Sequence, residues 1–193
     1  LRPYNVLFAP DPSTSNRGNV GGALGNNSCG SHSVKWGKTI DHTLELDTVL
    51  TNGETHLFKN TDRSAVKGYT TGDNFLSVIY KNILQIGTTN AHEVKKQFPK
   101  IMRRVSGYNL DEIKPDSDFN MARFLVGSEG TLLTITEAKM KVVPIPQNKI
   151  LAVIHFHELS QALESTVLTL EHSPDAVELV GSMIIKQAQA NIS

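Results

Sequence analysis

The sequence lacks several features that mark whole classes of protein. Its 193 residues include one cysteine, Cys29, which excludes an internal disulfide and any cysteine cluster for zinc or an iron–sulfur centre within these residues. A single thiol is typical of a reducing compartment, so we expect a cytoplasmic protein. No apolar run approaches the roughly 20 residues that a membrane-spanning helix needs. The sequence therefore predicts no transmembrane segment.

An excess of charge of one sign is also missing. The 19 basic and 19 acidic residues give a formal net charge of zero, so we expect no surface for nucleic acid or anionic membranes. A hydrophobic content of 39% is enough for the core of one domain, or of one domain and part of another. The first residues, Leu1-Arg2-Pro3-Tyr4, have neither an initiator methionine nor a signal-peptide core, so we expect an excised piece of a longer protein.

A glycine-rich segment near the start is the most informative part of the chain. After Pro10-Asp11-Pro12-Ser13-Thr14 comes Val20-Gly21-Gly22-Ala23-Leu24-Gly25-Asn26-Asn27-Ser28-Cys29-Gly30. Glycines and small polar residues leave backbone amides free to approach a ligand closely, which suits a polyanion or a flat cofactor. Plain turns have the same composition and remain the alternative.

Two common nucleotide motifs do not fit this segment. A P-loop needs a glycine five residues before its Gly-Lys-Ser/Thr ending, whereas Gly37-Lys38-Thr39 has His32 at that position. The Gly-x-Gly-x-x-Gly spacing of the Rossmann fingerprint is absent among Gly18, Gly21, Gly22, Gly25 and Gly30. The ligand has to be identified from other motifs.

Two later motifs complete a family pattern. Gly107-Tyr108-Asn109-Leu110 and Val126-Gly127-Ser128-Glu129-Gly130-Thr131-Leu132 follow the first segment in order. Together with Pro-Asp-Pro-Ser, Gly-Gly, Asn-Asn-Ser-x-Gly and Trp36-Gly37, they resemble the second FAD-binding subdomain of the vanillyl-alcohol-oxidase, or PCMH-type, flavoprotein family. The most similar branch is the glycolate oxidase and D-lactate dehydrogenase group, whose large members join an FAD half to an iron–sulfur half.

The resemblance implies an α+β fold in two parts. Residues 1–146 would be the second FAD-binding subdomain, an antiparallel sheet flanked by helices, and residues 147–193 the first half of a ferredoxin-like substrate-covering (cap) domain of the FAD-linked oxidase type. It also implies which residues face FAD: Pro10, Asp11, Pro12, Ser13, Asn19, Gly21, Gly22, Asn26, Asn27, Ser28, Cys29, Gly30, Glu129, Gly130 and Ile135.

Structural alternatives stay open for several of these residues. Asn26, Asn27 and Ser28 are also suited to capping helices and turns. Glu129, between two glycines, can face solvent, and Leu133 stands where the family usually has a glycine. Cys29 is interpreted as a small buried side chain and not as a nucleophile.

The resemblance further implies the chemistry of the longer protein. Such an enzyme oxidises a D-2-hydroxy acid (D-lactate, glycolate or D-2-hydroxyglutarate class) by hydride transfer to FAD, and an iron–sulfur cluster is possible beyond Ser193. The family's pyrophosphate loop is expected before Leu1 and its catalytic residues after Ser193, so we name no catalytic residue here. The electron acceptor is not identified, and the longer protein can be peripheral to a membrane. The alternative is a folded, non-catalytic module that binds no FAD on its own and dimerises through exposed surfaces.

Other polar residues carry weaker signals. His155 and His157 would share one face of a strand, but with no third ligand in view we predict no metal site. Arg103 and Arg104 are suited to holding a phosphate or carboxylate, although a solvated pair is the more common outcome.

Local patterns predict the following elements in residues 1–146. Period-two alternation on both sides of Asn52-Gly53 indicates a β-hairpin. Asn74 is expected to cap a helix that ends at Gly87, followed by a second helix over residues 90–98 before Pro99. Residues 111–118 read as a surface loop, and residues 132–143 as a long strand in the hairpin's sheet.

Beyond a linker at residues 144–148 the pattern changes to β-α-β-α. Strands are expected at 149–156 and 176–180, and helices capped by Ser160 and Ser182. Half a sheet leaves an unpaired edge, so this part should need a partner.

Overall fold

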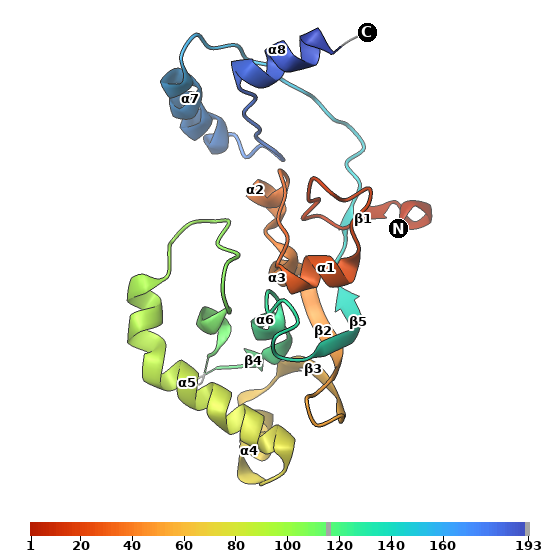
Figure 1. Cartoon of the computed structure of the whole chain (residues 1–193), viewed down its shortest axis with the longest axis vertical. Helices are drawn as coiled ribbons and strands as arrows, with labels where there is room; N and C mark the ends of the chain where they lie inside the picture. Colours follow the sequence, from red (N-terminus) through yellow and green to blue (C-terminus); the bar gives the residue numbers. More distant parts are fainter. Residues whose placement is uncertain (115–116, 192–193) are drawn as a thin grey trace.

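A computed structural model describes residues 1–114 and 117–191, and the fold is α+β (Figure 1). The main sheet is antiparallel, with strand order β4 (Phe119–Asn120), β3 (Thr55–Thr61), β2 (Thr43–Val49) and β5 (Thr134–Met140). A second sheet pairs β1 (Val6–Leu7) with β6 (Val143–Pro144). The helices are η1 (Arg2–Tyr4), α1 (Val20–Gly25), α2 (Ser33–Trp36), α3 (Thr39–His42), α4 (Arg63–Thr71), α5 (Phe75–Gln97), η2 (Leu110–Glu112), α6 (Met121–Leu125), α7 (Leu159–Glu171) and α8 (Ser182–Ala190).

The predicted hairpin is confirmed as β2 and β3. Leu46 pairs with Phe58 in the antiparallel ladder, and Gly53 adopts a positive φ of 86° in the turn. Leu46, Thr48 and Leu50 alternate with more exposed residues and point into the core. The later strand joins the same sheet through β5, also as predicted, but it is shorter than residues 132–143. Val143–Pro144 leaves the sheet and pairs with β1.

One long helix replaces the two that the sequence predicts. The Asn74 side chain accepts a hydrogen bond from the Ser77 amide at 2.8 Å, which confirms the predicted cap of α5. Gly87 does not end the helix, and α5 continues to Gln97 before Pro99. A Cβ at Gly87 would overlap the Ile113 side chain. Gly87 therefore allows Ile113 to pack closely against α5, and it does not mark the C-terminus of the helix.

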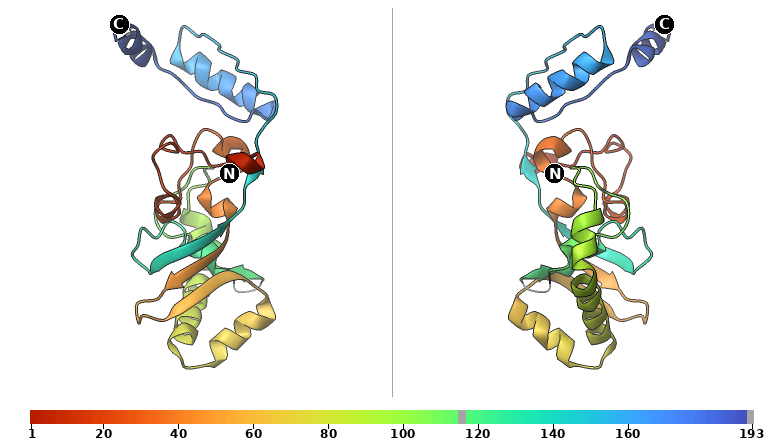
Figure 2. Two further views of the ribbon diagram at one scale, coloured as in Figure 1. Left: turned by 90° about the vertical axis from the view of Figure 1, so that its right-hand side faces the viewer. Right: turned by 90° about the vertical axis from the view of Figure 1, so that its left-hand side faces the viewer.

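The core lies between the main sheet and helices α4, α5 and α6 (Figure 2). Tyr80 of α5 is 1% exposed and stacks on Tyr69 of α4, with ring centroids 4.6 Å apart. Phe58 of β3 and Phe119 of β4 complete this aromatic layer. The helices thus cover one face of the sheet.

The predicted loop at residues 111–118 is partly structured. Residues 110–112 form η2, and Ile113 is buried at 6% exposure against α5. The prediction of a surface loop is wrong for this part of the segment. Its polar, proline-containing composition indicates a loop, but the apolar Ile113 side chain anchors it to α5. Residues 115 and 116 lie outside the described part of the chain.

The two predicted C-terminal strands do not form, whereas the two helices do. In the described chain, residues 149–156 and 176–180 form no strand and have no ladder partner. Strands need hydrogen-bonded neighbours, and the two segments do not supply them to each other. Helices satisfy their own backbone, so α7 and α8 form, starting after Glu158 and Gly181.

This C-terminal part lies at the end of the molecule opposite α4 (Figure 1). The predicted linker at residues 144–148 begins later than expected. Pro144 belongs to β6, and the Ile145 amide donates to the Asn5 carbonyl at 3.0 Å. Among the described residues, no helix has both the length and the apolar character that crossing a bilayer requires.

Candidate functional site

The first motif is a tight loop held against Gly30. Asp11 has a positive φ of 39°, and its Oδ2 lies 3.0 Å from His32 Nδ1. A Cβ on Gly30 would overlap the carbonyl oxygens of Pro10 and Asp11. Only a glycine at residue 30 therefore allows the loop at residues 10–13 to pack where it does.

The Gly-Gly pair forms the start of a short helix. Asn19 caps α1, accepting a hydrogen bond from the Gly22 amide at 2.7 Å. Gly21 and Gly22 are exposed, whereas Ala23 and Leu24 face the core. The segment thus presents backbone to the surface on one side and is anchored by apolar side chains on the other.

Asn26, Asn27 and Ser28 make internal hydrogen bonds. Asn27 is fully buried with a φ of 51°, and its Oδ1 accepts from the Ile40 amide at 3.0 Å. Its Nδ2 has no partner among the described residues. The Ser28 carbonyl accepts from the amide and hydroxyl of Thr39, and the Ser28 hydroxyl donates to Asn26 Oδ1 at 2.6 Å. These hydrogen bonds are typical of turn capping, the structural role that the sequence offers as an alternative for these three residues.

The second motif converges on the first, as the resemblance implies. The Gly127 amide donates to the Leu24 carbonyl at 2.8 Å, and the Glu129 amide donates to the Gly25 carbonyl at 2.9 Å. Gly127, Glu129 and Gly130 all have positive φ values. Segments about a hundred residues apart in the chain therefore form one backbone surface. Glu129 itself is exposed, and Leu133 packs against the core.

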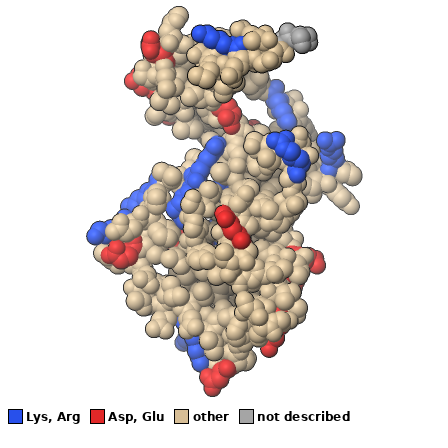
Figure 3. Space-filling view, in the orientation of Figure 1, with Lys and Arg blue, Asp and Glu red and all other residues tan. Residues whose placement is uncertain are grey.

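A cleft of about 1890 Å³ lies between the first motif and the C-terminal part. Figure 3 shows it as the hollow between the upper part of the molecule and the body. Its opposite wall includes residues 148–159 and 174–182 and one side of α7. Of the residues predicted to face FAD, the following line it: Asp11, Pro12, Asn19, Gly22, Asn26 and Ser28. The others lie outside its lining: Pro10, Ser13, Gly21, Asn27, Cys29, Gly30, Glu129, Gly130 and Ile135.

The weaker sequence signals have structural explanations. Arg104 holds the carboxylate of Asp111 at 2.6 Å and lies over the Phe98 ring, whereas Arg103 is exposed. His155 and His157 line the cleft, but the segment that carries them is irregular and forms no strand. Within residues 1–114 and 117–191, no group of three potential ligands is placed to hold a metal ion.

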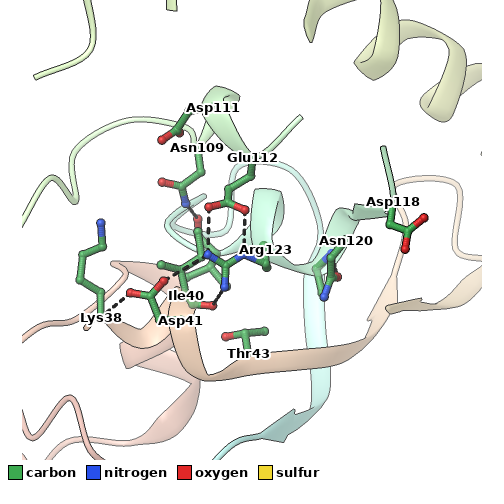
Figure 4. A network of polar contacts seen from close by, with 12 residues as sticks. Lys38, Ile40, Asp41, Thr43, Asn109, Asp111, Glu112, Asp118, Asn120 and Arg123 are labelled. Carbon is green, nitrogen blue, oxygen red and sulfur yellow. Dashed lines mark hydrogen bonds and ion pairs between the residues drawn. The ribbon is translucent and has the colours of Figure 1, made fainter. Parts of the chain in front are cut away.

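Sequence reasoning missed Arg123, which lies beneath the glycine-rich surface. Its guanidinium contacts both carboxylate oxygens of Glu112, the Ile40 carbonyl and Asp41 (Figure 4). The hydrogen bonds to Glu112 raise the pKa of Arg123 above its ordinary value. No sequence pattern reveals this residue, because its partners come from distant segments.

Comparison with known proteins identifies the chain's family. Residues 1–59 match the family described as "FAD binding domain". D-2-hydroxyglutarate dehydrogenase of Pseudomonas putida is 33% identical over all 193 residues. The chain is related to proteins of this FAD-binding family.

Other members of this family show how far the similarity extends. D-2-hydroxyglutarate dehydrogenase of Haemophilus influenzae is 34% identical, again over the whole chain. Glycolate oxidase subunit GlcD of Bacillus subtilis is 28% identical over 75% of the chain and 20% of its own length. The chain spans about a fifth (19%) of the length of the two dehydrogenases. The family match at residues 1–59 contains the first motif and most of the hairpin.

Proposed function

We propose that this chain forms one wall of the FAD site in an oxidoreductase that oxidises a D-2-hydroxy acid. One observation carries the proposal: the Gly127 and Glu129 amides bond to the carbonyls of Leu24 and Gly25, which joins the second glycine-rich motif to the first, and residues of the first motif line the cleft. Backbone close to a ligand without intervening side chains is what a flat, multiply hydrogen-bonding cofactor requires.

The residues of this surface fit a flavin in size and chemistry. The cleft is larger than the roughly 300–1,000 Å³ of a typical small-molecule pocket, which leaves room for an extended dinucleotide. Asn19, Asn26 and Ser28 line it with amide and hydroxyl groups, and Gly22 leaves the start of α1 open. We assign all fifteen predicted residues to the FAD site. Predicted residues that do not line the cleft, such as Asn27, would hold the backbone of the lining residues in place.

FAD, when bound, supplies the hydride acceptor, and the chain's own residues hold and orient it. No residue of this chain is assigned as catalytic. The substrate class is supported by the names of the relatives, which include D-2-hydroxyglutarate dehydrogenases, a glycolate oxidase subunit and D-lactate dehydrogenases. Because four relatives at 30–34% identity over the whole chain are D-2-hydroxyglutarate dehydrogenases, this acid is the first substrate to test.

We divide the chain into a second FAD-binding subdomain, residues 1–146, and the start of the cap domain, residues 147–193. The change in packing supports this boundary. Buried apolar side chains continue to Val143, whereas Ile150 and Leu151 beyond it are 97% and 88% exposed. An iron–sulfur cluster, the electron acceptor and a cytoplasmic or membrane-peripheral location belong to the longer protein and stay predictions.

The second candidate is a folded module that does not retain FAD by itself. The opposite wall of the cleft includes irregular segments with exposed apolar side chains, such as Ile150 and Leu151, which supports weak binding and self-association. The contacts of one wall have to offset the entropic cost of association, about 4–15 kcal/mol. We expect the 193-residue chain to bind FAD weakly and to form dimers or aggregates.

Titration with FAD separates the two candidates. Flavin fluorescence and absorbance are measured with the 193-residue chain and with the full-length protein, alongside sedimentation to follow self-association. We expect tight binding and flavin reduction by D-2-hydroxyglutarate, D-lactate or glycolate only for the full-length protein. Micromolar or tighter binding by the short chain would show that one wall is sufficient. A full-length protein without FAD would refute the proposed function, and one that no hydroxy acid reduces would refute the substrate class.

A further inference from the structure

The ion cluster around Arg123 joins η2 and α6 to α3, which lies about 80 residues earlier in the sequence. Arg123 Nε and Nη2 donate to the two carboxylate oxygens of Glu112 at 2.7 and 2.9 Å. Nη1 donates to the Ile40 carbonyl at 2.9 Å, and Nη2 also reaches Asp41 at 3.1 Å. Figure 4 shows the guanidinium between the Glu112 carboxylate and α3. Such a fork of fixed donors holds its partners at set distances and angles.

Helix α3, whose Ile40 carbonyl accepts a hydrogen bond from Arg123, is itself hydrogen-bonded to the first motif. The Ile40 residue whose carbonyl accepts from Arg123 donates its own amide to Asn27 Oδ1. The preceding residue, Thr39, donates both its amide and its hydroxyl to the Ser28 carbonyl. Two hydrogen bonds therefore connect Arg123 to the buried side chain of Asn27.

The backbone of Arg123 leads directly into the second motif. Arg123 lies in α6, which ends at Leu125, two residues before Gly127. Gly127 packs against the first motif, because a Cβ placed on it would lie 3.4 Å from the Asn27 Cβ. The same residue thus contacts the support of one motif through its side chain and carries the other motif through its backbone.

The surroundings of the cluster indicate that it is rigid. The side chains of Arg123 and Glu112 are 28% and 19% exposed, and Asp41 also accepts from the Lys38 amide at 2.9 Å. Each partner is therefore held by a second contact or by burial. A charged group with this many partners is costly to disturb, because removing one leaves the others unpaired.

From this arrangement we propose that Arg123 is a positioning residue that sets the register of the two flavin-facing motifs. The proposal rests on the proposed FAD site. Arg123 is not among the residues that line the cleft, and it acts through Ile40 and through the path of α6. Its loss shifts residues 26–28 relative to residues 127–130, and the flavin-facing surface loses its shape.

The test compares three variants of the full-length protein. Arg123→Lys keeps the charge and removes the fork, and Glu112→Gln keeps the shape and removes the charge. Lys139→Gln is the matched control, because it breaks an exposed ion pair with Glu45 on the sheet. We expect FAD affinity to fall about tenfold or more in the first two variants and to stay unchanged in the control, since binding groups have to be held within roughly 0.5 Å. Bound flavin should also show an altered visible circular dichroism spectrum.

Hydrogen exchange without FAD provides a second, independent readout. We expect the amides of Ile40, Gly127 and Glu129 to exchange faster in Arg123→Lys and Glu112→Gln, while those of Leu46 and Phe58 in the main sheet keep their protection. Uniformly faster exchange would mean that Arg123 only stabilises the fold, and unchanged exchange with unchanged affinity would overturn the proposal. If the wild-type protein bound no FAD, the proposed function would fail, whereas the exchange pattern would still decide the role of Arg123.

Discussion

At the scale of single residues, glycines have different roles that composition alone does not distinguish. Gly53 makes the hairpin turn with a positive φ, and Gly30 lets the loop at residues 10–13 pack closely. Gly87 lies inside a helix, where a glycine weakens the helix relative to alanine by about 1 kcal/mol. It is tolerated because the Ile113 side chain occupies the space that a Cβ would need.

The contrast between two helical glycines gives a direct test. Gly87→Ala should lower the free energy of unfolding by about 1–3 kcal/mol, the usual cost of overpacking, in spite of the better helix propensity. Gly68→Ala in α4 meets no atom within 4 Å and should raise stability by up to about 1 kcal/mol. Urea unfolding of both variants measures the difference. Equal effects of the two substitutions would show that the α5–Ile113 contact is not tight.

At the scale of elements, an aromatic layer attaches α4 and α5 to the sheet. His56 of β3 packs edge-on against Phe58, with centroids 4.6 Å apart, and against Tyr69 of α4 at 5.9 Å. Its Nε2 is buried without a hydrogen-bond partner among the described residues. Burial lowers the pKa of His56 below its ordinary value of 6.5, so the folded protein favours the neutral ring.

This packing predicts a loss of stability in mild acid. As the pH falls through about 6.5, the unfolded chain takes up a proton at His56 before the folded protein does, which favours unfolding. The loss ends once the pH passes below the folded pKa. We expect His56→Phe to flatten this part of the pH dependence in urea unfolding, whereas His92→Gln, at an 85% exposed side chain, leaves it unchanged. If the free energy of unfolding fell with pH equally steeply in His56→Phe and in the wild type, the loss of stability would not come from His56.

At the scale of the whole molecule, two parts differ in packing. Residues 1–146 contain almost all of the buried apolar side chains, whereas residues 149–191 contribute only Ala162. A polar contact across the cleft is the ion pair between Lys35 of α2 and Asp175. The C-terminal part thus has little to stabilise a fixed arrangement in isolation.

This difference should appear in native-state hydrogen exchange. Amides of residues 150–156 have no ladder partner and should exchange orders of magnitude faster than those of β2 and β3, which form the centre of the sheet. Exchange of the 193-residue chain, followed by mass spectrometry of its peptides, measures this contrast. Comparable protection in the two regions would indicate that the C-terminal strands find partners after all, for instance in a dimer.

Some features of this protein follow from the sequence by itself, because their physical causes are local. The Asn52-Gly53 turn needs only residues that accept the turn geometry, and the Asn74 cap bonds to an amide three residues away. The glycine-rich motifs were recognisable for the same reason, since each is a short run of residues. The fold class and the family could be predicted from these runs and their order.

Tertiary structure alone decided the remaining features, because their causes lie in distant segments. Gly87 looks like a helix end until Ile113 is seen against it, and residues 149–156 look like a strand until no partner is found. The hydrogen bonds that join residues 127–129 to α1, and those from Arg123 to Ile40 and Asp41, depend on contacts across about 80 to 100 residues of chain. Local pattern carries no information about which distant groups meet, because packing selects them only when the whole core forms.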